Sequence, residues 1–162
     1  MIYAVVLAAG ASSRYGTSPP KQQELLPFVL AALAETGVDG VVVVSGAHPL
    51  AVESVHCPEW RLGAGASLRC GLTALPDGVE AAVVVLADGP DLDPRAVDRV
   101  IEAWRDERDE VVAASYDGVR LHPVLLARAA WSRIPDGGAR ELEARLVPCD
   151  DLSPPGDVDR RR

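Results

Sequence analysis

The sequence lacks any long run of apolar residues and any excess of positive charge. No stretch approaches the roughly 18 consecutive apolar residues of a transmembrane helix, and Met1 leads into an apolar segment without the basic residues of a secretory leader. The 162 residues include 16 Lys and Arg against 24 Asp and Glu, for a net charge of −8. Because such a surface repels polyanions overall, we expect no nucleic-acid partner and no membrane association. The missing transmembrane run and leader pattern lead us to expect a cytoplasmic location.

Cysteine is also scarce. The three cysteines, Cys57, Cys70 and Cys149, form no C-x-x-C pair and are odd in number, which is typical of reduced thiols inside a cell. The three histidines do not have the spacing of metal ligands either. We therefore expect free, inert thiols and no structural zinc site.

What the chain does contain is an alternation of strand and helix patterns. Runs of β-branched residues at 2–7, 41–44 and 81–86 are typical of strands buried in a parallel sheet. Apolar residues recur at helical spacing over residues 25–34 and 94–106. With 48% apolar residues, a chain of this length can bury one proper core. The pattern predicts an α/β fold with a single domain spanning the 162 residues.

Residues 2–21 join a predicted strand to a turn of small residues and two cations. Gly10 and the alanines around it let main-chain N–H groups approach a polyphosphate without an intervening Cβ, and Arg14 and Lys21 can neutralise phosphate charge. Neither a P-loop motif nor a G-x-G-x-x-G fingerprint is present. From the turn alone, an ordinary strand–turn–helix junction with solvated cations explains the pattern equally well.

The string Leu-Ala-Ala-Gly-Ala-Ser-Ser-Arg-Tyr-Gly, followed by a lysine, resembles the signature of the MobA-like nucleotidyltransferases. These enzymes activate small molecules with a nucleoside triphosphate (NTP), and their molybdenum cofactor cytidylyltransferase branch is the most similar. The resemblance implies a three-layer α/β sandwich of the nucleotide-diphospho-sugar transferase type, with a Rossmann-like, mostly parallel sheet that includes an antiparallel strand. It also implies that Arg14 and Lys21 stabilise the leaving pyrophosphate, although the gap between Gly16 and Lys21 is longer than usual in the family.

A second glycine-rich segment, residues 57–72, runs into Ser67, which we predict to be the N-cap of a short apolar helix. The family has a tryptophan, a glycine-rich turn and a Ser-Leu pair in this place, and its cytidylyltransferases use the loop and serine to read the base. Cys57 stands where the family usually has asparagine. By this resemblance the nucleotide-binding residues are Leu7, Ala8, Ala9, Gly10, Ser12, Arg14, Gly65, Ser67 and Asp88.

The predicted strand over residues 81–87 ends on Asp88, at the sheet edge where ligands collect in open α/β folds. A carboxylate is a hard oxygen ligand for Mg²⁺, and the family's Asp-x-Pro motif holds the catalytic metal here. The alternative is a simple Asp-Gly-Pro turn; Asp93, followed by proline, is itself predicted to be a helix N-cap. The C-terminal Gly-Asp-Val-Asp begins like the family's second metal motif, which makes Asp157 and Asp159 further expected ligands.

His122 and Arg140 are the expected acceptor-binding residues. His122 lies in a segment similar to the family's Gly-His-Pro-Val, with Leu121 in place of the glycine; a lone histidine is more often structural. Residues 136–146 are predicted to form a helix whose glycine-rich start and Arg140 suit an anion, although Asp136 could serve simply as its N-cap.

Together these features favour Mg²⁺-dependent nucleotidyl transfer, with Arg14, Lys21 and Asp88 as catalytic residues. CTP is the preferred NTP, and the acceptor is a small phosphorylated molecule. Molybdopterin is the family's best-known acceptor, while related enzymes use sugar phosphates, polyol phosphates and phosphonates. The alternative is a homologue that has lost catalysis and binds a nucleotide or regulates a partner, since each departure from the family falls near a proposed site. The sequence does not indicate an oligomeric state.

Overall fold

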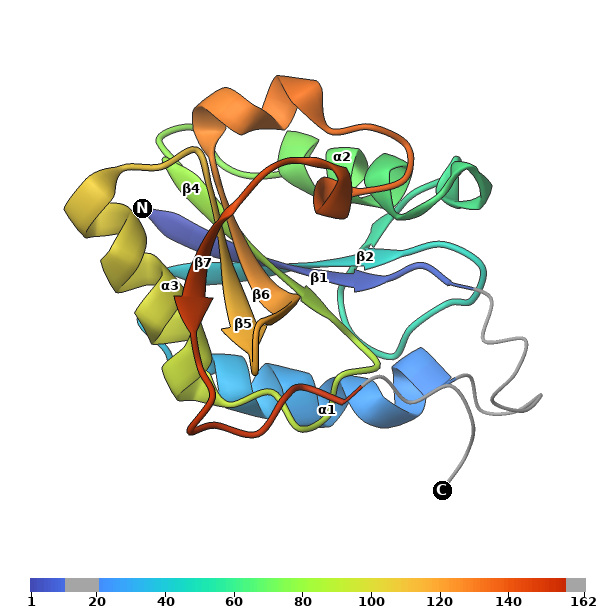
Figure 1. The fold of residues 1–162 in the computed structure, drawn as a ribbon. Coiled ribbons are helices and arrows are strands. Elements are labelled where there is room, and N and C mark those ends of the chain that lie inside the picture. Colours follow the sequence, from blue (N-terminus) through green and yellow to red (C-terminus); the bar gives the residue numbers. More distant parts are fainter. Residues whose placement is uncertain (11–20, 157–162) are drawn as a thin grey trace.

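The computed structural model describes residues 1–10 and 21–156, without the side chains of Lys21 and Gln22. These residues form a seven-stranded sheet with helices on both faces (Figure 1). The strands are β1 (Ile2–Ala8), β2 (Gly40–Ser45), β3 (Val55–His56), β4 (Ala81–Leu86), β5 (Val111–Tyr116), β6 (Val119–Ala127) and β7 (Arg145–Pro148). Their order across the sheet is β3-β2-β1-β4-β6-β5-β7.

The sheet is mixed because one strand runs against the others. β1 pairs in parallel with β2 and β4, whereas β6 is antiparallel to both β4 and β5. β5 and β6 form a hairpin whose two turn residues, Asp117 and Gly118, have φ values of 51° and 80°. This is the two-residue Asp-Gly turn that matches the twist of the flanking strands. The predicted mostly parallel sheet with an antiparallel strand is confirmed.

Helices on the two faces make the fold three-layered (Figure 1). The helices α1 (Lys21–Leu33) and α3 (Pro94–Glu107) cover one face, and α2 (Ala64–Thr73) covers the other. Successive side chains of β1 alternate between these two cores: Ala4 and Val6 pack with the α1 and α3 side, and Val5 packs with Leu68 and Leu72 of α2. The predicted three-layer α/β sandwich is therefore confirmed. No helix among the described residues is both long and apolar enough to cross a membrane.

The start of α3 agrees with the prediction, whereas the start of α2 does not. Asp93 caps α3 by accepting a hydrogen bond from the Arg95 N–H at 2.9 Å, with Pro94 in the first helical position. α2 begins at Ala64 with Gly63 as its N-cap, so Ser67 is not the cap. Ser67 lies in the first turn of the helix and is 4% exposed.

The predicted helix over residues 136–146 is wrong. A single 3-10 turn, η3 (Ala139–Glu141), forms there, and the chain is extended again at Leu142 before it enters β7. The physical reason is Arg120 of β6, which donates to the carbonyl oxygens of Leu142 at 2.6 Å and Ala139 at 2.9 Å. These acceptors are therefore engaged by a side chain from another strand rather than by a continuing helix.

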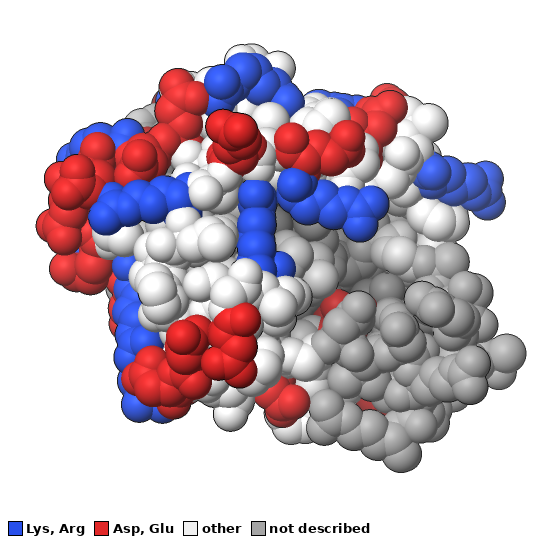
Figure 2. Space-filling view, in the orientation of Figure 1, with Lys and Arg blue, Asp and Glu red and all other residues white. Residues whose placement is uncertain are grey.

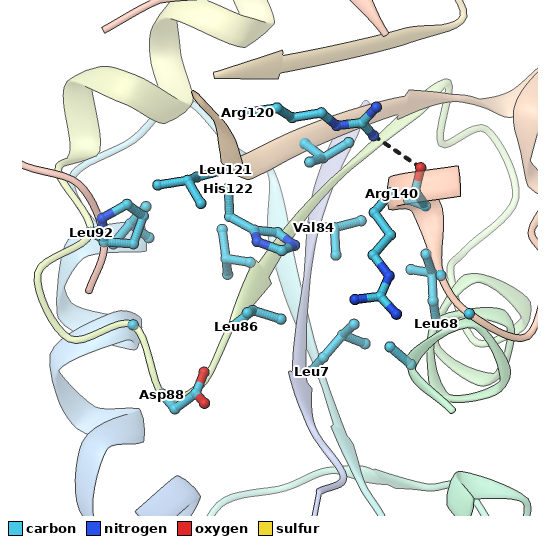
Figure 3. Close-up of a pocket in the computed structure, with 18 of the residues that line it drawn as sticks. Leu7, Leu68, Val84, Leu86, Asp88, Leu92, Arg120, Leu121, His122 and Arg140 are labelled. Atoms are coloured by element: carbon cyan, nitrogen blue, oxygen red, sulfur yellow. Dashed lines mark hydrogen bonds between the residues drawn. The ribbon is translucent and has the colours of Figure 1, made fainter. Parts of the chain in front are cut away.

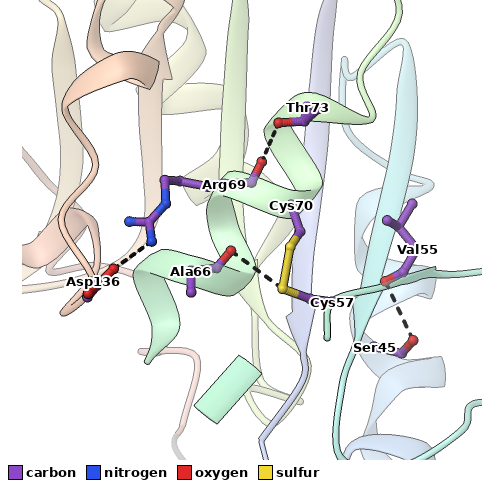
Figure 4. Close-up of a disulfide and its surroundings, with 8 residues drawn as sticks. All are labelled: Ser45, Val55, Cys57, Ala66, Arg69, Cys70, Thr73 and Asp136. Atoms are coloured by element: carbon purple, nitrogen blue, oxygen red, sulfur yellow. Dashed lines mark hydrogen bonds and ion pairs between the residues drawn. A yellow bond between two sulfur atoms is a disulfide. The ribbon is translucent and has the colours of Figure 1, made fainter. Parts of the chain in front are cut away.

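Two of the three cysteines form a disulfide, contrary to the expectation of free thiols (Figure 4). Cys57 follows β3 and Cys70 lies on α2, and the fold brings their Cα atoms to 5.9 Å, within the range that a disulfide spans. The spacing of 13 residues has no recognisable motif, so the pairing could not be read from the sequence. Cys149 is a free, buried cysteine, as expected.

Candidate active site

A cavity of about 720 Å³ opens at the end of the sheet where β1 and β4 finish. Figure 2 shows a hollow on this face with a basic side chain at its rim, and Figure 3 shows the cavity's interior. Its walls come from β1, β4, β6, the start of α2, and η3 with the two residues before it. The described lining residues are Leu7, Leu62, Gly63, Ala64, Leu68, Val84, Val85, Leu86, Asp88, Gly89, Leu92, Arg120, Leu121, His122, Val124, Gly137, Gly138, Ala139, Arg140, Pro155 and Gly156.

Asp88 lies where the sequence predicts it, in the turn that follows β4. The Ala87 N–H donates to the carbonyl of Leu7 at 3.0 Å, so the pairing of β1 with β4 continues up to the residue before Asp88. The Asp91 N–H donates to the Pro155 carbonyl at 2.9 Å, which holds the C-terminal segment against this turn. Asp88 is the sole acidic residue among the described lining residues.

β6 contributes four residues to the cavity. Arg120, His122 and Val124 stand at alternate positions, as expected for one face of a strand, and Leu121 between them lines the cavity as well. Sequence reasoning missed Arg120, although its spacing of two from His122 was the available signal. The Arg120 guanidinium donates hydrogen bonds to the carbonyl oxygens of Ala139 and Leu142, and these bonds hold η3 in the cavity wall.

His122 lies in the cavity wall. The Tyr116 hydroxyl donates to the His122 carbonyl at 3.1 Å, and the peptide bond to Pro123 is cis. Burial lowers the pKa of His122 to about 4; Asp88 opposes this shift and Arg120 reinforces it. The imidazole is therefore neutral at pH 7 and can donate or accept a hydrogen bond without carrying charge.

Arg140 lies on the opposite side of the cavity and points toward Leu7 and Leu68 (Figure 3). Its side chain is exposed, and among the described residues no carboxylate forms an ion pair with it. Arg140 is thus a cation available to an anionic ligand. It points toward Leu7, one of the expected nucleotide-binding residues, and its acceptor-binding role stays a prediction.

The start of α2 lies close against residues 135 and 136. The Gly65 N–H donates to the Asp136 carbonyl at 2.8 Å, and a Cβ on Gly65 would stand 1.6 Å from the Pro135 carbonyl oxygen. Only glycine fits this close approach. Gly63 and Ala64 line the cavity, whereas Gly65 and Ser67 are buried behind them and are not lining residues.

The other expected site residues divide between described and undescribed parts of the chain. Leu7 lines the cavity, Ala8 and Ala9 are buried beside it at the end of β1, and Gly10 is exposed. Lys21 is the first residue of α1. Outside the described residues, and so without a structural account, are Ser12, Arg14, Asp157 and Asp159, together with the side chain of Lys21.

Among the described residues, the cavity presents one carboxylate, which fits a metal ion held together with substrate phosphates. No group of three or more His, Cys, Asp or Glu side chains gathers at a metal site within residues 1–10 and 21–156. Mg²⁺ commonly takes one or two carboxylates, with substrate phosphates and water completing its shell. Asp88 is a carboxylate of this kind at the cavity wall.

Comparison with known proteins agrees with this geometry. The MobA-like NTP transferase domain matches residues 4–148. The chain belongs to this family. The match takes in Asp88, His122 and Arg140, the described residues at the centre of the predicted site.

Members of other nucleotidyltransferase groups are also similar to this MobA-like chain. The 2-C-methyl-D-erythritol 4-phosphate cytidylyltransferase of Xanthomonas campestris pv. campestris (strain B100) is 36% identical over 129 residues, 65% of this chain and 47% of the relative. The chain thus spans about half the length of that curated relative.

Among solved structures, Rv0371c from Mycobacterium tuberculosis H37Rv is similar with a TM-score of 0.80 and 27% identity, over 98% of this chain and 93% of that one. Its complex with manganese has a TM-score of 0.73 and 24% identity, covering 98% and 92% of the two chains. CMP:2-keto-3-deoxy-manno-octonic acid synthetase complexed with CTP has a TM-score of 0.72 at 14% identity, covering 98% and 93%. These likenesses confirm the nucleotide-diphospho-sugar transferase fold.

Proposed function

We propose that this MobA-like protein is a nucleotidyltransferase that moves a nucleoside monophosphate from an NTP to a small phosphorylated acceptor. One observation carries the proposal: a single cavity joins Leu7 and the start of α2, on the nucleotide side, to Asp88 and His122. Ligands of open α/β sheets bind at this carboxyl edge, and the cavity is within the usual size of ligand sites.

The reaction forms one bond and breaks one. An oxygen of the acceptor's phosphate attacks the α-phosphorus of the NTP in line, and the bond from the α-phosphorus to the bridging oxygen breaks to release pyrophosphate. Such a transfer needs positioning and neutralisation of charge more than a covalent nucleophile. The cavity would supply both, since its walls could orient two ligands and Asp88 and Arg140 are charged residues in those walls.

Asp88 would hold Mg²⁺, with Asp157 or Asp159 as a second carboxylate. The bound ion supplies Lewis-acid neutralisation of the phosphate oxygens. Rv0371c is described in complex with manganese, which supports a divalent cation in this fold. Arg14 and Lys21 would balance the charge of the departing pyrophosphate.

CTP is the proposed donor, as in the cytidylyltransferases to which the chain is similar. Leu7 to Gly10 with Ser12 and Arg14 would contact the nucleotide, and Gly65 and Ser67 would support the turn that reads the base. Because Gly63 and Ala64 stand in front of Gly65 and Ser67 in the cavity wall, we assign direct contact to the first pair. His122 would contact the acceptor as a neutral donor, and Arg140 would bind a phosphate group.

A cytoplasmic location remains part of the proposal, because the donor is a nucleoside triphosphate. The expectation of free thiols no longer supports it, since Cys57 and Cys70 are paired. Molybdopterin stays one candidate acceptor among phosphorylated small molecules.

The test is thermal stabilisation of the protein by CTP, GTP, UTP, dTTP and ATP, each with and without Mg²⁺. A ligand that binds only the folded state raises the melting temperature. We expect the largest shift with CTP, dependent on Mg²⁺. Binding independent of Mg²⁺, with no pyrophosphate released for any acceptor, would instead favour a nucleotide-binding homologue without catalysis. No shift with any nucleotide would contradict the proposal.

A further inference from the structure

The acceptor side of the cavity is apolar. Leu86, Leu92 and Leu121 lie on the same side as His122 and Asp88, away from Leu68 and Arg140 (Figure 3). Leu86 ends β4, Leu92 follows the Asp88 turn, and Leu121 belongs to β6. We call these three leucines the acceptor wall.

Polar side chains are few around this wall. Of the 21 described lining residues, Asp88, Arg120, His122 and Arg140 alone have polar side chains, and none is Ser, Thr, Asn, Gln, Tyr or Lys. Arg120 already donates to two main-chain carbonyls, and Arg140 lies across the cavity (Figure 3). Asp88 is needed at the phosphates, so among the described lining residues His122 is the side chain left to a polar group of the acceptor.

A wall with few polar side chains favours acceptors with an apolar body over acceptors with many hydroxyl groups. A polyol phosphate carries several hydroxyl groups, and burying each without a hydrogen-bond partner costs free energy. An acceptor with a hydrocarbon body binds more favourably against the same wall, because removal of apolar surface from water is favourable. Leu121 lines the cavity and is 39% exposed, so a ligand that covered it would bury apolar surface.

We propose that the acceptor is a phosphate monoester with a compact apolar body, aryl or branched alkyl, seated against Leu86, Leu92 and Leu121. Its phosphate points to Asp88, where the oxygen that attacks the α-phosphorus is placed. This inference rests on the proposed function for the direction of the phosphate, and it departs from the polyol phosphate named for the similar cytidylyltransferase.

Binding is measured by calorimetry with two probes of the same charge, phenyl phosphate and glycerol 3-phosphate, added to the protein with Mg²⁺ and CTP. Pyrophosphate release is followed in parallel. We expect phenyl phosphate to bind at least about tenfold more tightly, the usual effect of fitting an apolar group to an apolar pocket. Leu121→Ser should remove most of that preference.

Val119→Ser is the matched control. Val119 lies two residues before Leu121 on β6, is 57% exposed and is not a lining residue, so its substitution should leave the preference unchanged. Tighter binding of glycerol 3-phosphate, no binding of phenyl phosphate, or an unchanged preference in Leu121→Ser would overturn the inference. Phenyl phosphate could bind in a Leu121-dependent way while CTP neither binds nor releases pyrophosphate. That result would support the acceptor wall and contradict the proposed reaction.

Discussion

The Arg69 guanidinium donates to the Asp136 carboxylate at 2.5 Å, joining residues that lie 67 positions apart in the chain (Figure 4). The same side chain donates to the Ile134 carbonyl at 2.8 Å. With the Gly65 to Asp136 main-chain bond, these contacts join α2 to residues 134–136. Because α2 and the chain after Asp136 both line the cavity, and Arg69 is not itself a lining residue, we expect Arg69 to position the cavity wall.

Arg69→Ala should therefore impair the site more than the fold. The ion pair is solvent-exposed, and such pairs contribute about 1 kcal/mol or less to the free energy of unfolding. Misplacement of the Gly63 turn should lower kcat/KM for the NTP by up to about 100-fold. Arg105→Ala is the control, since Arg105 pairs with Glu102 on the surface of α3 at 3.9 Å and is not a lining residue. Equal losses of activity in both variants would contradict this role.

Asp88→Asn should abolish metal-dependent turnover while leaving the protein folded. The amide keeps the shape of the side chain but removes the charge that a divalent cation requires, and we expect turnover to fall by about two orders of magnitude or more. Pyrophosphate release and the melting temperature are measured together, with Asp106→Asn on α3 as a surface control. Unchanged turnover in Asp88→Asn would remove this residue from the metal site.

The disulfide predicts a redox-dependent stability. Cys57 and Cys70 are 13 residues apart, and in the chain-entropy account a crosslink over a loop of this size stabilises the folded state by about 3 kcal/mol. A reductant should lower the free energy of unfolding measured with urea by up to this amount. The double variant Cys57→Ala, Cys70→Ala should be less stable than the oxidised protein and insensitive to the reductant. A reductant effect that persists in the double variant would assign it to something other than this bond.

The sequence predicts the sheet better than the walls of the cavity. Runs of β-branched residues are a local signal, and they identify β1, β2 and β4 correctly. The Asp93 cap is also local, because its partner is the N–H of Arg95 only two residues away.

The failures arise where a distant part of the chain decides the local structure. Ser67 resembles an N-cap, yet α2 starts one turn earlier, where Gly65 packs against the Pro135 carbonyl. The residues around Ala139 look helical, yet Arg120 from β6 takes two of their carbonyls. The pairing of Cys57 with Cys70 likewise depends on how α2 lies against β3. Such contacts leave no periodic trace in the sequence.

His122 predicts how stability depends on pH in the protein without ligands. Burial lowers its folded-state pKa to about 4 from an ordinary value of 6.5. Between these values the unfolded chain binds a proton that the folded chain does not, so stability rises with pH across this window and is lost as the pH falls below 6.5. The loss between pH 7 and pH 5 should be about 2 kcal/mol at most.

His122→Gln removes this titration while keeping a neutral polar side chain. The free energy of unfolding is measured from urea curves at pH 7 and pH 5 for both proteins, and the carboxylates that also titrate are common to both. We expect a smaller decline in His122→Gln, whereas His56→Gln, on an exposed histidine, should decline much as the wild type does. If the free energy of unfolding declines equally in the wild type and in His122→Gln, then protonation of the His122 imidazole does not destabilise the folded protein. The cavity around it would then be more polar than its described walls, which would weaken the case for an apolar acceptor.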